Sequence, residues 1–227
     1  MIKIIKKVND MSMRLSSLKS TFLVIILFLG SNYAFAAIEI SKSIYKSVPF
    51  SSQFIEDGAL IRNVDYKSVN SLIPQLNEIY GLKLEDRGEA HITVITPPEA
   101  QGWFTDKKGI NFLISSLELH NKYFPTLQKT KFEVICVGKQ QNSQGNVVFY
   151  LVIDSPELIK IRKEIQKELE NRAKFLGKKT FFDAEKQYYP HITIGYKGGD
   201  VHGVSKGIET CIKHDLDFIK IQNSPQK

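Results

Sequence analysis

The sequence predicts an α+β fold made of two similar lobes around a central cleft. A tetrad of the form His-apolar-Thr-apolar occurs twice, as HITV at 91–94 and HITI at 191–194, one hundred positions apart. Each tetrad lies in an apolar, β-branched run typical of a strand, and a helical segment precedes and follows each run. A predicted hairpin joins the two halves. We therefore expect one continuous, duplicated domain over residues 55–222.

The pattern of apolar residues gives the expected elements in order. Strands are expected at 58–66, 90–95, 130–139, 146–154, 189–196 and 216–222, and helices at 68–81, 107–121, 155–176 and 204–214. Ser155 and Pro156 suit the N-cap and first position of the third helix, and Gly177 suits its end. Pro74 counts against an unbroken first helix, because a proline in a helix interior removes a hydrogen bond. A kinked turn is the alternative for part of that stretch.

The first 36 residues have the features of a secretory signal peptide. A basic segment precedes the uncharged stretch TFLVIILFLG at 21–30, and Ala34 and Ala36 form an A-x-A cleavage pattern. The uncharged stretch is shorter than the roughly 20 residues that a membrane span needs. We expect cleavage after Ala36, a secreted or periplasmic mature protein, and no stable membrane association after cleavage. An uncleaved N-terminal anchor is the alternative. Residues 37–54 are expected to be a lead-in and 223–227 a polar tail.

Most of the positive charge belongs to this leader. Residues 1–36 hold five Lys or Arg and one Asp, so they carry +4 of the formal net charge of +7 and leave +3 for the mature chain. A mild positive charge suits an anionic ligand without requiring one. The mature chain also has no long basic run of the kind found in nucleic-acid-binding tails. Composition alone therefore gives no argument for strong nucleic-acid binding.

Two cysteines, Cys136 and Cys211, lie in the predicted mature chain. An exported chain enters an oxidising compartment, so a single disulfide is one interpretation. Cys136 lies in an apolar run, so a buried free thiol is the other. The sequence has no C-x-x-C pair and no Cys–His cluster, and it predicts no metal site.

The two tetrads present chemically active side chains. Side chains alternate along a strand, so His91 and Thr93 share one face, His191 and Thr193 share one face, and the apolar members point the other way. Two imidazoles supply a general base and a general acid near neutral pH. Threonine hydroxyls donate to non-bridging phosphate oxygens. This set favours phosphodiester cleavage without a metal ion. A hydrogen-bonded structural role is the alternative for either histidine taken alone.

The paired tetrads resemble the H-x-[S/T]-x motifs of the 2H phosphoesterase superfamily, which includes the RNA 2′,3′-cyclic phosphodiesterases. The resemblance covers residues 55–222, and YYPHITIGY at 188–196 matches the second motif closely. It implies two antiparallel-sheet lobes with outer helices, no cofactor, and catalysis by His91 and His191 with Thr93 and Thr193 on phosphate. A nucleotide or short RNA is the implied substrate, and we expect a monomer. The prolines after the first motif and the export signal depart from many members.

Several further residues are weaker candidates. Tyr189 and Tyr196 flank the second tetrad and are predicted to stack on a base, with strand packing as the alternative. Trp103 either edges the cleft or closes the core, and Lys197 either faces a phosphate or ends its strand in solvent. The histidines outside the tetrads are interpreted as surface or helix-end residues: His120, His202 and His214.

Three functions fit the sequence. An exported phosphoesterase is the leading hypothesis, because it uses both tetrads. A non-catalytic exported module that binds phosphorylated ligands or nucleic acid is the second, although two intact tetrads argue against a decayed enzyme. A structural secreted domain is the third, and it leaves the paired tetrads to chance.

Overall fold

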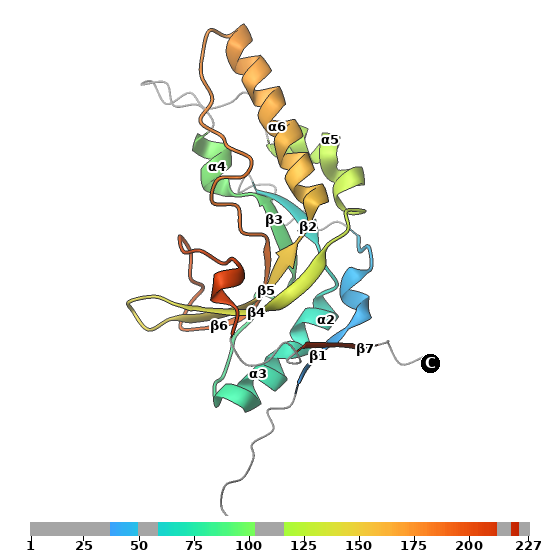
Figure 1. Cartoon of the computed structure of the whole chain (residues 1–227), viewed down its shortest axis with the longest axis vertical. Coiled ribbons are helices and arrows are strands. Elements are labelled where there is room, and N and C mark those ends of the chain that lie inside the picture. The colour runs from blue at the N-terminus through green and yellow to red at the C-terminus, as the bar shows by residue number, and fades with distance from the viewer. Residues whose placement is uncertain (1–36, 50–58, 103–115, 213–218, 223–227) are drawn as a thin grey trace, which may run out of the picture. The chain divides into compact units, whose positions relative to one another are not determined.

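The computed structural model describes residues 37–49, 59–102, 116–212 and 219–222 (Figure 1). The predicted signal peptide, the 223–227 tail, Trp103 and His214 lie outside the described residues. Within the described parts of the chain, no helix combines the length and apolar character that a bilayer crossing requires.

A five-stranded antiparallel sheet is the main element of the fold. Its strand order is β2-β3-β6-β5-β4. The strands are β2 (Leu60–Asn63), β3 (His91–Ile95), β4 (Glu133–Gln141), β5 (Val147–Asp154) and β6 (His191–Lys197). A separate two-stranded parallel sheet pairs β1 (Ile38–Ser41) with β7 (Ile219–Gln222), so the predicted lead-in contains a strand. The other strands lie where the sequence predicts them, within a few residues at each end.

Both histidine strands lie in the middle of this one sheet. β3 and β6 are antiparallel neighbours, with Ile92 opposite Ile192. The sequence predicts that each histidine strand lies in its own lobe, and the family resemblance implies an antiparallel sheet in each; this bilobed division is not confirmed. Periodicity identifies strands but does not specify which strands pair, because the partners here are about one hundred residues apart. The structure shows a mixed α/β chain with one main sheet.

The helices follow the predicted order with three changes: the first predicted helix is divided in two, a short helix is added after β3, and the described part of 204–214 forms no α-helix. They are α2 (Tyr66–Asn70), α3 (Leu72–Tyr80), α4 (Pro97–Gly102), α5 (Ser116–Leu127) and α6 (Pro156–Phe175), with short 3₁₀ turns η1 (Lys42–Tyr45) and η3 (Ile208–Thr210). The predicted helix 68–81 is two helices that meet at Ser71. Pro74 then falls in the first turn of α3, where its missing N–H breaks no helical hydrogen bond.

Two segments differ from the sequence prediction. The double proline begins α4, in which Thr96 and Glu99 form a capping box: Thr96 N donates to the Glu99 carboxylate at 2.8 Å, and Glu99 N donates to Thr96 Oγ1 at 3.3 Å. The prediction of a helix at 204–214 is wrong for the described residues of that segment. The described part of that segment forms only η3, because the backbone after it pairs with β4. Cys211 forms an antiparallel β-bridge with Gly138, and Ile212 N donates to Val137 O at 2.9 Å.

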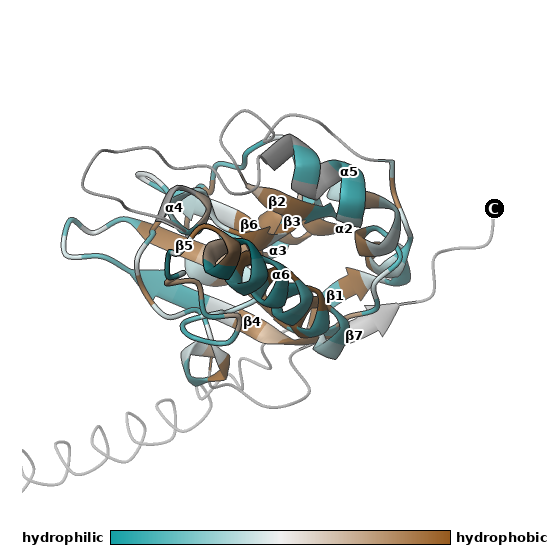
Figure 2. Cartoon of the chain, turned by 90° about the horizontal axis from the view of Figure 1, so that it is seen from above, coloured by the Kyte–Doolittle hydropathy of each residue, from teal (hydrophilic) through white to brown (hydrophobic). Residues whose placement is uncertain are grey.

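One face of the sheet forms the main hydrophobic core with the helices. The apolar members of both tetrads, Ile92, Val94, Ile192 and Ile194, are all buried on this face. They pack with the apolar side of α6, which includes Leu158, Ile165 and Leu169. Figure 2 shows largely hydrophobic strands alongside helices that carry hydrophilic residues. The core therefore fixes which tetrad residues are turned away from it.

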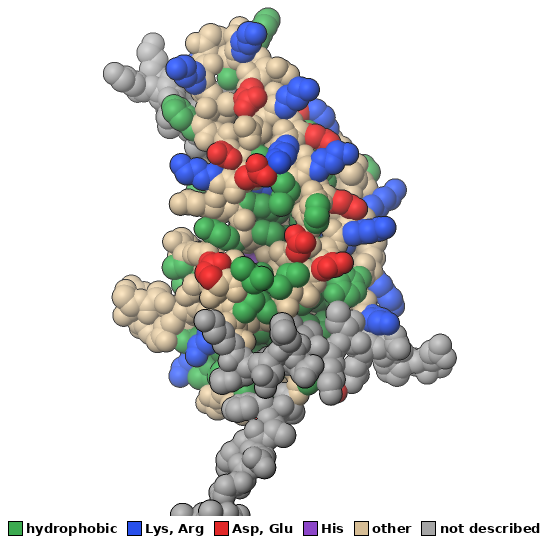
Figure 3. All heavy atoms as spheres, viewed as in Figure 1, with side chains coloured by type: hydrophobic (Ala, Val, Ile, Leu, Met, Phe, Trp, Pro, Cys, Tyr) green, Lys and Arg blue, Asp and Glu red, His purple; other side chains and the backbone are tan. Residues whose placement is uncertain are grey.

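The outer side of α6 carries charges of both signs (Figure 3). Glu168 and Arg172 form an i, i+4 ion pair at 2.8 Å, and both also pair with α5, through Lys122 and Glu118 respectively. Exposed pairs of this kind contribute about 0.2–1 kcal/mol each. This surface is a solvated helix face.

A disulfide joins Cys136 of β4 to Cys211, 75 positions later. It lies beside a second, smaller apolar cluster of Val148, Tyr150, Val152 and Val201, on the face of the sheet opposite the main core. The alternative of a buried free thiol is therefore excluded. The cross-link ties the 198–212 segment to the edge of the sheet.

Removing this disulfide is expected to lower the free energy of unfolding by about 2–4 kcal/mol, because the closed loop restricts the unfolded chain. Urea unfolding of the Cys136→Ala/Cys211→Ala variant measures the change. Reductant should destabilise the wild type to a similar extent and leave the double variant unaffected. A wild-type midpoint that does not move on reduction would contradict the structural role.

Candidate active site

Both tetrads present their polar members on the same face of the sheet. Extending the antiparallel register by one residue from Ile92 and Ile192 places His91 opposite Thr193 and Thr93 opposite His191. Directly opposite residues of neighbouring strands have Cβ atoms roughly 4.5–5.5 Å apart. All four side chains line one cavity of about 1060 Å³. The histidine and threonine of different tetrads are thus neighbours in a single site.

Each tetrad ends in a bulge at the same position. On β3, Thr93 pairs with Ile61 and Ile95 with Leu60, so Val94 is an extra residue. On β6, Thr193 pairs with Tyr150 and Gly195 with Phe149, so Ile194 is the extra residue. A bulge reverses the alternation of side chains that follow it. The two strands therefore expose His and Thr, and bury the residues around them, in the same pattern.

His91 is oriented by a carboxylate. Its Nδ1 lies 2.6 Å from Glu89 Oε2, and the two side chains are 10% and 12% exposed. A carboxylate only accepts hydrogen bonds, so Nδ1 carries a hydrogen and Nε2 is the nitrogen through which His91 exchanges a proton. Glu89 precedes His91 by two positions, on the same side of an extended chain. Glu89 is not among the predicted site residues, although this spacing is a sequence signal for its contact with His91.

His191 is oriented by the backbone and by a cation. Its Nδ1 donates to the carbonyl oxygen of Tyr189 at 2.7 Å, and Lys206 Nζ lies 3.2 Å from its Nε2. The ring of Tyr150 meets the imidazole edge-on, with centroids 5.6 Å apart. Burial, followed by the charge of Lys206, lowers the pKa of His191 to about 3. His191 is therefore a neutral imidazole at physiological pH, with its Nε2 lone pair toward Lys206.

A group of charged loop residues extends the site beyond His191. Asp200 is ion-paired with Arg87 and lies 3.8 Å from Lys206 Nζ and 3.7 Å from His202 Nε2. Arg87, His202 and Lys206 line the cavity. His202 is largely exposed, as predicted, yet it belongs to the rim of the site. No motif marks these loop residues in the sequence, because loops that are distant along the chain bring them together.

The paired tetrads on adjacent strands agree with a comparison of the whole sequence. Residues 62–202, more than half of the chain, match the model of the family described as Swiss Army Knife, 2H phosphoesterase domain. The chain belongs to the 2H phosphoesterase family. No curated protein and no solved structure matches it.

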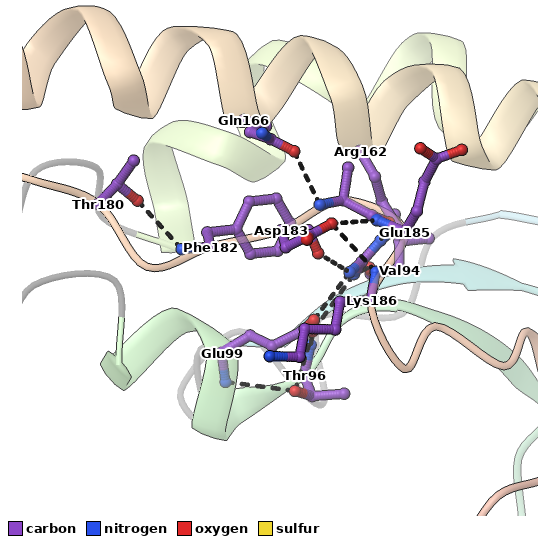
Figure 4. Close-up of polar contacts among 11 residues, drawn as sticks. Val94, Thr96, Glu99, Arg162, Gln166, Thr180, Phe182, Asp183, Glu185 and Lys186 are labelled. Carbon is purple, nitrogen blue, oxygen red and sulfur yellow. Dashed lines mark hydrogen bonds and ion pairs between the residues drawn. The ribbon is translucent and has the colours of Figure 1, made fainter.

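In this 2H phosphoesterase, Arg162 of α6 holds the cavity wall together (Figure 4). Its guanidinium is fully buried and donates to the carbonyl oxygens of Val94 at 2.5 Å, Ala184 at 2.6 Å and Asp183 at 3.3 Å. It also forms an ion pair of 2.8 Å with Glu99 of α4. One side chain therefore connects the end of β3, α4 and the 183–189 loop.

The remaining predicted site residues take different positions. Tyr189 lines the cavity of the 2H phosphoesterase and is 37% exposed, so its ring is accessible to a ligand. Tyr196 lies beyond the bulge and packs on the second cluster, and it is not among the described residues that line the cavity. Lys197 is exposed at the end of β6. The described residues contain no group of three His, Cys, Asp or Glu side chains arranged for a metal ion.

Proposed function

We propose that this 2H phosphoesterase is an exported enzyme that hydrolyses a cyclic phosphate or phosphodiester in a nucleotide or at an RNA end, by acid/base catalysis between His91 and His191. The observation that carries the proposal is that His91, Thr93, His191 and Thr193 line one cavity, from adjacent antiparallel strands in which Ile92 lies opposite Ile192. Two imidazoles and two hydroxyls on one cavity wall are the groups that metal-independent phosphoester hydrolysis uses.

The surroundings of the two histidines support different roles. His191 is neutral and its Nε2 carries a lone pair, so it accepts the proton of an attacking water. His91 has the Glu89 carboxylate on Nδ1, a partner suited to a protonated ring, so it donates a proton from Nε2 to the departing ester oxygen. Water then adds to phosphorus, the ester bond breaks, and a proton transfer through solvent restores both rings.

The threonines and the cavity rim bind the rest of the substrate. Thr93 and Thr193 donate to the non-bridging phosphate oxygens, where negative charge increases in the transition state. Tyr189 stacks on a base from the rim, as single-stranded nucleic acids stack on aromatic rings. Tyr196 supports β5 and β6 from the second cluster. The cavity of about 1060 Å³ accommodates a nucleotide with a neighbouring group.

Two broader features belong to the same proposal. The Cys136–Cys211 disulfide supports export, because disulfides persist in oxidising compartments. The pattern of residues 1–36, which is typical of a cleavable signal peptide, supports it independently. The matching bulges after Thr93 and Thr193 support an internal duplication of the two tetrads. The mature protein acts as a monomer without a cofactor.

A substrate screen of the mature protein tests this function. We expect hydrolysis of at least one member of a panel of 2′,3′-cyclic nucleotides, 2′-5′ oligonucleotides and RNA 3′ ends, with activity unchanged by excess EDTA. Loss of activity that added metal restores would exclude the metal-independent mechanism. Tight binding of panel members without turnover would instead identify a non-catalytic binding module.

A further inference from the structure

Lys206 is a buried cation directed at a catalytic histidine. The residue is 5% exposed, and Nζ lies 3.2 Å from His191 Nε2. Its ammonium also lies 5.4 Å from the centre of the Tyr150 ring. An ammonium has only donors, so the Lys206–His191 contact is a hydrogen bond from Nζ to the Nε2 lone pair. This is the same nitrogen that takes a proton from water in the proposed reaction.

The charge of Lys206 is only partly compensated. Among the described residues, the carboxylate paired with Lys206 is that of Asp200, 3.8 Å away, and it is also ion-paired with Arg87. Two cations thus share one carboxylate at the wall of the cavity, and the excess positive charge faces the His191 side of the site. Keeping a cation buried costs free energy unless a partner compensates it. An anionic group of a ligand, placed beside His191, supplies that compensation.

The fold holds Lys206 in place through its neighbours. The carbonyl oxygen of Ser205 accepts from Gln140 Nε2 at 2.9 Å, and Thr210 Oγ1 accepts from Tyr150 Oη at 2.7 Å. The disulfide at Cys211 fixes the far end of the same segment to β4. Lys206 lies just beyond residues 62–202, the part of the chain that matches the family.

We propose that Lys206 is a third catalytic residue of this site, whose ammonium leaves His191 Nε2 when substrate binds and donates to a non-bridging oxygen of the phosphate. The proposal rests on the proposed phosphoesterase function. In the empty site the ammonium holds the Nε2 lone pair and keeps His191 unprotonated. In the occupied site it carries part of the developing phosphate charge while His191 receives the proton from water.

Titratable and charged groups on several neighbouring elements surround this pair. The groups around Lys206 and His191 are His91, Tyr150, Arg87, Asp200, His202 and Glu209. Burial, followed by the charge of Arg87, lowers the pKa of Lys206 to about 8. The ammonium is therefore present below about pH 8 and is lost as the pH rises above it. The contribution of Lys206 to catalysis is expected to disappear over the same range.

Three variants of the mature protein test the proposal. Lys206→Met keeps an unbranched side chain as far as Cε and removes the ammonium, and Lys206→Arg keeps the charge. Lys129→Met removes one exposed lysine in the turn after α5 as a matched control. We expect Lys206→Met to lower kcat/KM for a 2′,3′-cyclic nucleotide by about 10²-fold, the effect of removing one donor to a developing oxyanion. Lys206→Arg should retain more activity, and Lys129→Met should match the wild type.

Two measurements without turnover separate a catalytic from a structural role. Titration of the imidazole NMR signals should show a higher pKa for His191 in Lys206→Met than in the wild type, because one of the charges that disfavour its protonation is gone. The Kd for inorganic phosphate should weaken by about tenfold or more in the same variant. An unchanged His191 titration, or wild-type kcat/KM in Lys206→Met, would overturn the proposal.

Failure of the proposed function gives a different result. If the wild type hydrolyses no phosphoester in the panel, or if His191→Ala remains fully active, the phosphoesterase mechanism is wrong. The phosphate Kd and the His191 titration still decide whether Lys206 binds an anion beside His191. If the wild type is active and His191→Ala is not, wild-type kcat/KM in Lys206→Met would reject the proposed role of Lys206 and leave the phosphoesterase mechanism standing.

Discussion

Replacement of either His91 or His191 by alanine is expected to lower kcat/KM by about 10²- to 10⁴-fold, the range of a single general acid or base. The two side chains line one cavity, and each is held through Nδ1, by Glu89 and by the Tyr189 carbonyl oxygen respectively. The reaction needs one proton accepted and one donated, so either loss alone should nearly stop turnover. Initial rates on the best substrate of the panel measure the effect.

Fold integrity and a matched histidine serve as controls for these variants. Both histidines are partly exposed, and their tetrads are held in the sheet by the buried residues Ile92 and Ile192, so the thermal midpoints should stay near the wild-type value. His120→Ala removes a histidine of α5 that belongs to neither tetrad, and it should keep wild-type rates. Full activity in either tetrad variant would show that the paired histidines are not the catalytic acid and base.

Replacement of Arg162 by methionine is expected to lower the free energy of unfolding by about 3–5 kcal/mol, because several backbone carbonyl oxygens and the partly buried Glu99 carboxylate lose their donor. The guanidinium is fully buried and serves three backbone carbonyl oxygens and the Glu99 carboxylate. Its planar face also lies against the rings of Tyr188 and Phe182, at 4.1 Å and 4.9 Å from the ring centres. Methionine fills part of the space but donates to none of these acceptors.

Chemical denaturation with a second arginine variant makes this prediction specific. Arg172 lies ten positions further along α6 and is ion-paired with Glu118 and Glu168, but its side chain is 32% exposed. Arg172→Met should cost about 1 kcal/mol or less, as exposed ion pairs do. Equal losses for the two variants would show that the buried contacts of Arg162 do not anchor the cavity wall.

The local parts of the fold were predictable from sequence. The alternation in HITV and HITI, the Ser155 cap and the long apolar side of α6 are properties of neighbouring residues, and the structure confirms all three. Strand pairing was not predictable in the same way. The two tetrads suggested two lobes, and the structure places their strands next to each other in one sheet, because pairing depends on contacts across about one hundred residues.

The site likewise contains residues that a local motif predicts and residues that only the folded chain brings together. His91, Thr93, His191 and Thr193 come from a repeated motif, and all four line the cavity. Glu89 had a weak signal in its two-residue spacing from His91. Lys206, Arg87 and Asp200 had none, since they are isolated polar residues in loops until the chain folds. Simple alternation from His191 would turn Tyr196 toward the core. The bulge at Ile194 instead places it on the face of the second cluster, where it packs outside the cavity.

The register between β3 and β6 limits which parts of this protein tolerate changes in length. A shift of one residue in either strand would turn a histidine and a threonine into the apolar core, so insertions there would destroy the site. Residues such as Phe181, Tyr189 and His202 reach the cavity from loops, where changes of length are tolerated. Selection is therefore able to alter ligand preference along the rim while the reaction encoded by the strands is inherited unchanged.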